Sequence, residues 1–358
     1  MLLFFLFIFI VLFTVSNIHG SSRTQTQWMI LFCFVSFVLT GMRWNFGGDW
    51  DTYYDYFTSI KELDFKSSFE FGWVVLSYLV KITTNSYTLF QFLIAGIFFF
   101  CIANSIKKLS VLPLLSYMIY FATNHGGINY VRTGVATCII IYSLIYAEEK
   151  NIKKYLIACF FAFSIHFSAF VALPIYWIYN NTISYKRYFY VFIVVVAFFY
   201  FSGKIFLSEF NYLGPYVQYK LDKYISAQEA GEYFGSTISV ETAMVNYIFK
   251  KSFIFIFLLL YCRKSLEQDK MFRGLTNVYI AGTVFYCSVV PIAMQFGRMA
   301  GYMDGTEMFL VPLIYKYIQK SSNKKVFIFL VIVVNFIRIK GHLDPNNPLI
   351  YDYHWILF

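Results

Sequence analysis

The sequence predicts an all-α, polytopic integral membrane protein with about 10–13 transmembrane helices, some of them re-entrant or broken near the outer face. Two observations predict this class. Only 13% of the 358 residues are charged and 59% are hydrophobic, whereas a soluble domain carries roughly 25% charged residues. Long apolar runs also recur along the chain, and we expect one transmembrane domain over residues 1–358.

Eleven apolar runs divide the chain, and several are short for a hydrocarbon core that needs about 20 helical residues. The first run has no early Lys or Arg, so we expect a retained span rather than a cleaved signal peptide. The runs cover residues 2–18, 28–42, 87–106, 111–123, 129–147, 155–179, 187–203, 245–261, 275–294, 307–319 and 326–340.

Basic residues in short loops predict the orientation, because such loops stay on the cytoplasmic side. The Lys- and Arg-rich loops include residues 148–154, 263–273 and 316–325. Three segments then fall outside the membrane, and the second is long enough to form a lid. These external loops are residues 43–69, 204–244 and 295–306.

Two segments do not fit a simple series of crossings. Residues 155–179 lie between basic loops, so the chain must cross an even number of times, which predicts a hairpin with its tip near residues 165–168. Residues 70–82 fit a re-entrant or interfacial helix better than a span. Irregular backbone at membrane depth needs cover from protein or a water-filled cavity, so both segments point to a cavity near the outer face.

Four ionisable residues at or within the spans are candidate site residues. Arg43, Arg132, His166 and Arg298 all fall toward the outer side by this topology. Guanidinium groups match phosphate oxygens and stay charged at low dielectric, so a lipid-linked diphosphate is a natural ligand. The alternative for each arginine is snorkelling to the interface, and for the histidine a hydrogen-bonded core position.

The loop "GGDWDTYYDYF" adds carboxylates beside Arg43. Asp49 and Asp51 form a D-x-D pair, which in many sugar-nucleotide transferases holds a divalent metal, but three residues are a weak signal. Asp49 could instead hold Arg43, bind sugar hydroxyls or act as a general base. Gly47 and Gly48 allow either a close backbone approach to a ligand or a plain turn.

These motifs occur in an order that resembles the EpsG-like and Wzy-like polysaccharide polymerases of bacterial envelopes. The chain carries "R-x(3)-G-G-D-x-D-x-Y-Y", then "FEFGW", "NYVRTGVA", "IHFSAFVALP" and "GRMAGYM". The resemblance covers roughly residues 30–320. Thr133 departs from the family pattern, which often has Gln after the arginine of the third motif.

The resemblance implies a glycosyltransferase that polymerises undecaprenyl-diphosphate-linked repeat units at the outer face of the bacterial inner membrane. Donor and acceptor are then both lipid-linked oligosaccharides, membrane lipid surrounds the protein, and a chain-length regulator is a possible partner. No metal or other cofactor is expected. Matched by position, Arg43, Arg132, Arg298 and Glu70 bind substrate, while His166, Asp49 and Arg298 are catalytic candidates.

Three other functions remain open at this point. An O-antigen ligase or a related lipid-sugar transferase would use the same donor chemistry. A lipid-linked oligosaccharide flippase would also need buried charge, although no paired repeat is visible. A structural membrane partner would not need outer arginines. The net charge of +10 is explained by topology, so no nucleic-acid partner is expected.

Overall fold

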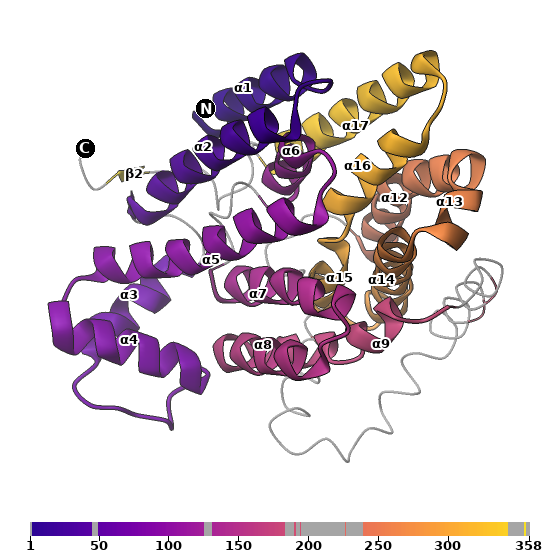
Figure 1. Ribbon diagram of the computed structural model, residues 1–358. Helices are drawn as coiled ribbons and strands as arrows, with labels where there is room; N and C mark the ends of the chain where they lie inside the picture. The colour runs from indigo at the N-terminus through magenta and orange to yellow at the C-terminus, as the bar shows by residue number, and fades with distance from the viewer. Residues whose placement is uncertain are drawn as a thin grey trace. The chain divides into compact units, whose positions relative to one another are not determined.

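The computed structural model describes most of the chain, and the described residues are predominantly helical, which confirms the all-α prediction (Figure 1). They form two compact units, Met1–Tyr176 with Glu307–Phe358, and Trp177–Thr306. A single transmembrane domain therefore stays a prediction. The described residues are 2–44, 49–124, 131–182, 190, 194, 226, 239–342 and 354–355.

The first unit contains the N-terminal helices and the two C-terminal ones. Its helices are α1 (Leu2–Ser16), α2 (Ser22–Gly41), α3 (Trp50–Ser59), α4 (Phe71–Thr84), α5 (Tyr87–Leu109), α6 (Pro113–Asn124), α7 (Val131–Glu148), α8 (Ile152–Ile165), the 3-10 helix η2 (Phe167–Ala172), α16 (Glu307–Tyr317) and α17 (Ser321–His342). A two-residue antiparallel pair joins β1 (Arg43–Trp44) to β2 (His354–Trp355).

The second unit, Trp177–Thr306, contains the helices between η2 and α16. Helix α9 (Ile175–Tyr179) crosses the boundary between the units. The described elements of this unit are α12 (Val240–Tyr261), α13 (Arg263–Gln268), α14 (Lys270–Val289), the 3-10 helix η4 (Met294–Ala300) and α15 (Gly301–Asp304).

Local capping residues set the helix ends in the first unit. The Ser21 hydroxyl accepts from the Thr24 amide at the start of α2, and the Ser86 hydroxyl accepts from the Leu89 amide at the start of α5. Asn85 closes α4 in the left-handed region at φ 52°. This tight turn makes α4 and α5 neighbours, and the two helices pack together (Figure 1).

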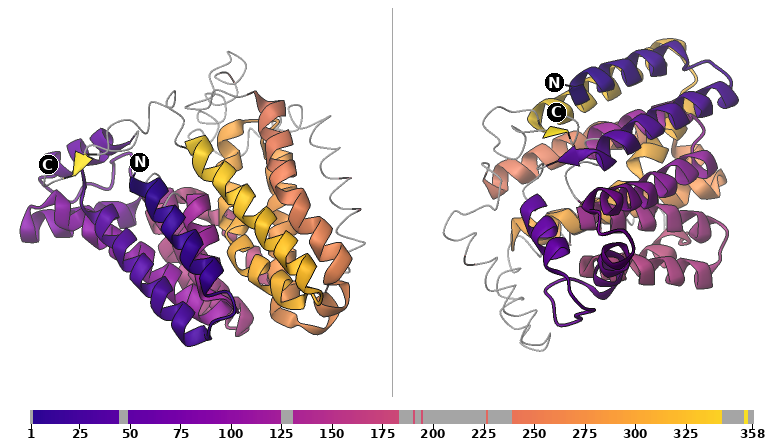
Figure 2. Two further views of the ribbon diagram at one scale, coloured as in Figure 1. Left: turned by 90° about the horizontal axis from the view of Figure 1, so that it is seen from above. Right: turned by 90° about the vertical axis from the view of Figure 1, so that its left-hand side faces the viewer.

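Helix α7 is the central helix of the first unit. It packs against α5 on one side and α8 on the other, and α5 also packs against α2 (Figures 1 and 2). The α2–α5 contact depends on Gly41, because a Cβ there would lie 2.4 Å from a ring carbon of Phe92. Removal of a side chain at this crossing brings the two backbones close together.

Four of the described helices are long and apolar enough to span a membrane, which supports the membrane class predicted from composition. Other apolar helices are shorter, and α4 and α8, with 14 residues each, reach only about 21 Å at 1.5 Å per residue. The predicted total of membrane helices therefore stays a prediction. The four are Ser22–Gly41, Tyr87–Leu109, Val131–Glu148 and Val240–Tyr261.

The predicted hairpin in residues 155–179 is a reversal of the chain at His166. Helix α8 ends at Ile165, His166 adopts an extended conformation with φ −150° and ψ 119°, and η2 follows. The Tyr155 hydroxyl donates to the Ala172 carbonyl oxygen over 2.7 Å, although 17 residues separate them. The chain therefore returns along α8, with the break at the predicted tip.

Two of the segments predicted as external loops contain helices. Within residues 43–69, α3 buries Trp50, Tyr53 and Phe57, which recur on one face at helical spacing. Residues 295–306 contain all of η4 except Met294, and the whole of α15. Aromatic side chains in these segments are buried against the rest of the protein, and a count of charged residues does not predict such packing. Most of the predicted span at 187–203 and most of the loop at 204–244 lie outside the described residues.

Gly72 sets the distance between α4 and α8, and its replacement tests that contact. A Cβ at Gly72 would lie 2.3 Å from Ser164 Oγ and 2.7 Å from the Ser164 carbonyl oxygen. We expect Gly72→Ala to lower the free energy of unfolding by about 1–3 kcal/mol, because backbone must move. Thermal unfolding of the purified protein in detergent measures this change.

Gly96 on α5 is the matched control. Its Cβ would meet only a ring carbon of Phe37 at 3.8 Å, which is an ordinary contact. Gly96→Ala removes a flexible residue from a helix interior, so we expect a gain of about 0.5–1 kcal/mol. Equal effects of the two substitutions would contradict the close α4–α8 crossing.

Candidate functional site

An arginine at the start of α7 is held by two side chains from different elements. The Arg132 Nη1 group donates to Glu70 Oε2 over 2.5 Å, and Arg132 Nε donates to the Tyr53 hydroxyl oxygen over 3.2 Å. The guanidinium carbon also lies 4.7 Å from the ring centre of Phe69. Tyr53 comes from α3, and Glu70 precedes α4, so residues far apart in sequence fix one guanidinium group.

The Glu70 carboxylate has a second role at the chain reversal. Its Oε1 accepts from the Phe167 backbone amide over 3.0 Å, while Oε2 holds Arg132. The Phe167 amide is the first of η2 and has no partner within that helix. Gly72 makes this reach possible, since it lets α4 approach Ser164 beside the reversal. Glu70 and Gly72, both from the "FEFGW" motif, therefore take part in the same contact between α4 and the chain reversal.

His166 lies at the reversal and is half-buried. Its Nδ1 accepts from the Ser168 amide over 3.3 Å and lies 2.7 Å from the Ser168 hydroxyl oxygen. Because a backbone N–H can only donate, Nδ1 acts as the acceptor, and the neutral ring then carries its proton on Nε2. His166 and Glu70 therefore both cap the first turn of η2.

The pKa of Tyr53 also depends on Arg43 and Asp49, two predicted site residues that precede it in the chain. Burial raises the pKa of Tyr53 above its usual value of 10.0, the positive charges of Arg132 and Arg43 lower this pKa, and the Asp49 carboxylate raises it. The phenol therefore stays protonated at neutral pH. Arg43 is only 4% exposed, whereas Asp49 is exposed at the start of α3. Gly47 and Gly48 lie outside the described residues.

Five of the six predicted site residues thus lie in the first unit, and three of them meet at one place. Glu70 contacts Arg132 directly and binds the amide next to His166. Arg43 and Asp49 act on the same tyrosine as Arg132. Arg298 belongs to the second unit, where it is exposed in the last turn of η4.

Comparison with models of known protein families identifies the family of this chain. The model of the EpsG family matches residues 26–354, nearly the whole length, including every predicted site residue. The chain belongs to the EpsG family. Membership indicates a membrane protein with a polysaccharide polymerase-like function. Searches among curated proteins and among solved structures found no match.

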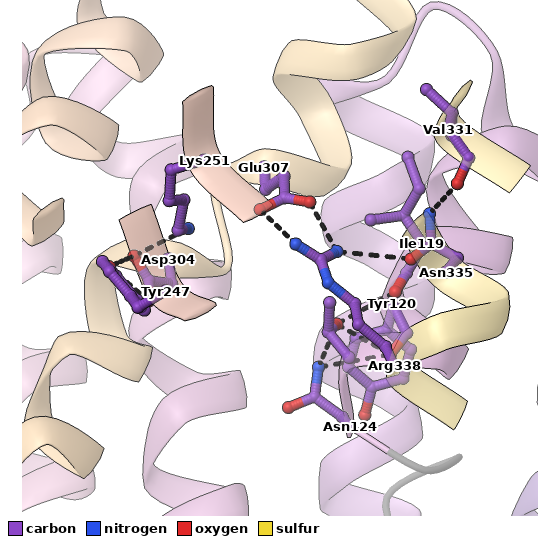
Figure 3. A network of polar contacts seen from close by, with 11 residues as sticks. Ile119, Tyr120, Asn124, Tyr247, Lys251, Asp304, Glu307, Val331, Asn335 and Arg338 are labelled. Carbon is purple, nitrogen blue, oxygen red and sulfur yellow. Dashed lines mark hydrogen bonds and ion pairs between the residues drawn. The ribbon is translucent and has the colours of Figure 1, made fainter. Parts of the chain in front are cut away.

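A second polar cluster of this EpsG-family protein lies in its second unit. Lys251, 4% exposed on α12, places its Nζ 3.0 Å from Asp304 Oδ1 and 4.2 Å from the ring centre of Tyr279. The Tyr247 hydroxyl lies 2.8 Å from Asp304 Oδ1 (Figure 3). Gly282 leaves room for this carboxylate, since a Cβ there would lie 3.1 Å from Oδ1. Through its contacts with Lys251 and Tyr247, Asp304 connects α15 to α12.

A third polar cluster is a buried, bidentate ion pair in the first unit. Arg338 Nη1 donates to Glu307 Oε1 over 2.6 Å, and Nη2 donates to Oε2 over 3.1 Å. Asn335 Oδ1 accepts from Arg338 Nη1 over 3.3 Å, and Figure 3 shows the three side chains facing one another. Both members of the pair are less than 10% exposed. The contact joins the start of α16 to α17.

The sequence analysis missed both of these clusters. Lys251 and Arg338 stand inside apolar runs that were predicted as spans, and an ionisable residue within a span is a candidate by default. That signal was present in the sequence. Their partners Asp304 and Glu307 lie three residues apart in sequence, and only the structure shows that they pair with different helices.

Glu70 substitutions test whether the carboxylate links α7 to the chain reversal. Glu70→Gln keeps an acceptor for the Phe167 amide but loses the charge, whereas Glu70→Ala loses both contacts. We expect Glu70→Ala to lower the free energy of unfolding by about 1–3 kcal/mol more than Glu70→Gln, because an amide is left without a partner. Thermal unfolding measures the difference, and the exposed Glu62→Ala is the control.

The Glu307–Arg338 pair allows a double-mutant cycle. Arg338→Met or Glu307→Gln alone leaves one buried group without its partner, and we expect each to cost about 3–5 kcal/mol. The double variant should cost less than the sum of the two single variants. Lys320→Ala, at an exposed site near the start of α17, is the control. Additive single effects would show that the pair is not energetically coupled.

Proposed function

We propose that this EpsG-family protein polymerises undecaprenyl-diphosphate-linked oligosaccharide repeat units at the outer face of the bacterial inner membrane. The match to the EpsG family supports the reaction class. The held guanidinium of Arg132 supports diphosphate as the recognised group. The growing chain leaves its lipid carrier and is transferred to an acceptor repeat unit, and a chain-length regulator is the expected protein partner.

Arg132 is prepared to bind phosphate oxygens. Among the described residues, two of its five N–H donors are engaged, one by Glu70 and one by Tyr53. These contacts fix the plane of the group before substrate arrives, which lowers the cost of ordering it. Glu70 offsets the charge of Arg132, and Arg43, which is close enough to act on Tyr53, supplies a second positive charge near a bound diphosphate.

In this proposal the arginines act on the leaving group. As the glycosidic bond to the carrier breaks, negative charge grows on the diphosphate, and Arg132 stabilises it electrostatically. Arg298 is assigned the same role from its position in the order of motifs alone. Guanidinium groups suit this role because they remain charged at any accessible pH. Arg298 is exposed in the last turn of η4.

The acceptor hydroxyl is assigned to His166 and Asp49. Because Nδ1 of His166 accepts from the Ser168 amide, the neutral ring carries its proton on Nε2, and an N–H donor is the kind of group that orients a sugar hydroxyl. Asp49 has an exposed carboxylate, which suits it to take the hydroxyl proton. Phe65, which is 59% exposed, and the exposed Asp51 and Asp55 supply contacts for sugar rings.

The test is deletion and complementation in the source strain, with surface polysaccharide resolved by size. We expect deletion to leave a single attached repeat unit and the wild-type chain to restore the ladder of longer products. Arg132→Ala and Arg298→Ala should lower polymer formation by about 100-fold or more, the loss typical of one electrostatic catalytic group. Expression level in the membrane is measured for each variant.

Two further variants sharpen the test. Arg132→Lys keeps the charge but loses the planar fork, so we expect partial activity at most. Lys108→Ala, at an exposed position at the end of α5, should restore the ladder fully. If deletion leaves no attached repeat unit at all, the polymerase proposal is wrong, and a flippase or a ligase accounts for the result.

A further inference from the structure

An apolar groove runs along the first unit beside the Arg132 site. It encloses about 740 Å³ between α4, α5, α7 and α8. Its walls are mostly apolar, with Val75, Ile139 and Phe161 among the lining side chains, and Lys154 and Tyr146 line the end away from Ser164. The Ser164 hydroxyl at the wall already donates to the Phe161 carbonyl oxygen over 2.7 Å. The groove therefore suits a hydrocarbon rather than a polar ligand.

One end of the groove lies beside the candidate site, although Glu70, Arg132 and His166 do not line it. Phe71 and Gly72 line it directly after Glu70, and Ile165 lines it directly before His166. From there the groove follows α7 from Val135 to Tyr146, a rise of about 16.5 Å at 1.5 Å per residue. It therefore starts at the polar cluster and continues between the helices for about half of a 30 Å hydrocarbon core.

We propose that this groove binds the isoprenoid chain of the lipid carrier, with the first isoprene units between α7 and α8 and the diphosphate at Arg132. The inference rests on the proposed function and assigns the tail of that substrate a place. A polar head at one end and an apolar channel leading from it match an amphiphile whose charge lies at a single terminus.

In this proposal the groove positions the substrate, and the transfer of its tail from the bilayer into the groove contributes little binding free energy. Lipid tails are as apolar as the groove walls, so moving a hydrocarbon from the bilayer gains little from the hydrophobic effect. A chain held between α7 and α8 does limit where the attached diphosphate can lie, which raises its effective concentration at Arg132. A phospholipid is the competing occupant, because bilayer lipid reaches the exposed rim at Ile157, which is 56% exposed.

Photolabelling tests the occupant without requiring turnover. The full-length protein is placed in phosphatidylglycerol nanodiscs with polyprenyl diphosphate that carries a diazirine in its first isoprene units. We expect labels on α7 and α8 within the groove, and competition by unlabelled polyprenyl diphosphate. Equal labelling by phosphatidylglycerol with a diazirine in its acyl chain, without competition by polyprenyl diphosphate, would overturn the inference.

Variants that fill the groove provide the second measurement. Val75→Trp and Ile157→Trp place a large ring in the channel, and we expect each to lower labelling about tenfold. Ile157 is at the exposed rim, so its replacement leaves the helix packing intact. Leu79→Trp, one turn from Val75 on α4 and 49% exposed outside the groove, should label like the wild type.

The polymer ladder separates this inference from the proposed function. Loss of groove labelling in a protein that still builds the ladder would overturn the tail site and leave the polymerase proposal standing. Competed groove labelling in a protein whose deletion does not affect chain length would support the tail site and overturn the polymerase proposal. Loss of ladder with Val75→Trp but not with Leu79→Trp would support both.

Discussion

The Glu70 carboxylate connects the two irregular parts of the first unit. One oxygen holds Arg132 at the start of α7, and the other accepts from the Phe167 amide where α8 reverses into η2. A broken helix within a membrane protein leaves backbone donors without partners, and such donors are costly away from water. Here the group that satisfies one donor also orients the guanidinium, so the site and the break depend on the same side chain.

The remaining contacts of the site follow from this carboxylate. Glu70 reaches the reversal only because Gly72 lets α4 approach Ser164 closely. Tyr53 then closes the other side of the guanidinium, and burial keeps its phenol protonated. The same α4–α8 crossing forms one end of the apolar groove, so a single helix contact borders both the place for a charged head and the place for a hydrocarbon chain.

The ionisable site residues that lie within recognisable motifs were predicted from the sequence. Those that lie in apolar runs without a motif were not. Arg132, Glu70 and His166 were predicted as site residues, and the structure brings them together at one reversal. Lys251 and Arg338 were not predicted, although both are buried and paired. The helix α3 was also missed, because the acidic residues of its segment indicated a solvent-exposed loop while its aromatic residues pack inward.

The sequence by itself determined the membrane class, the helical character, the break near His166 and the EpsG-like order of motifs, because these depend on local composition, charge position and spacing. Only the tertiary structure decided which charges pair. Tyr53, Glu70 and Arg132 lie 62 or more residues from at least one partner, and such contacts depend on how helices cross rather than on any local pattern. The groove is likewise a product of the space that four packed helices leave between them.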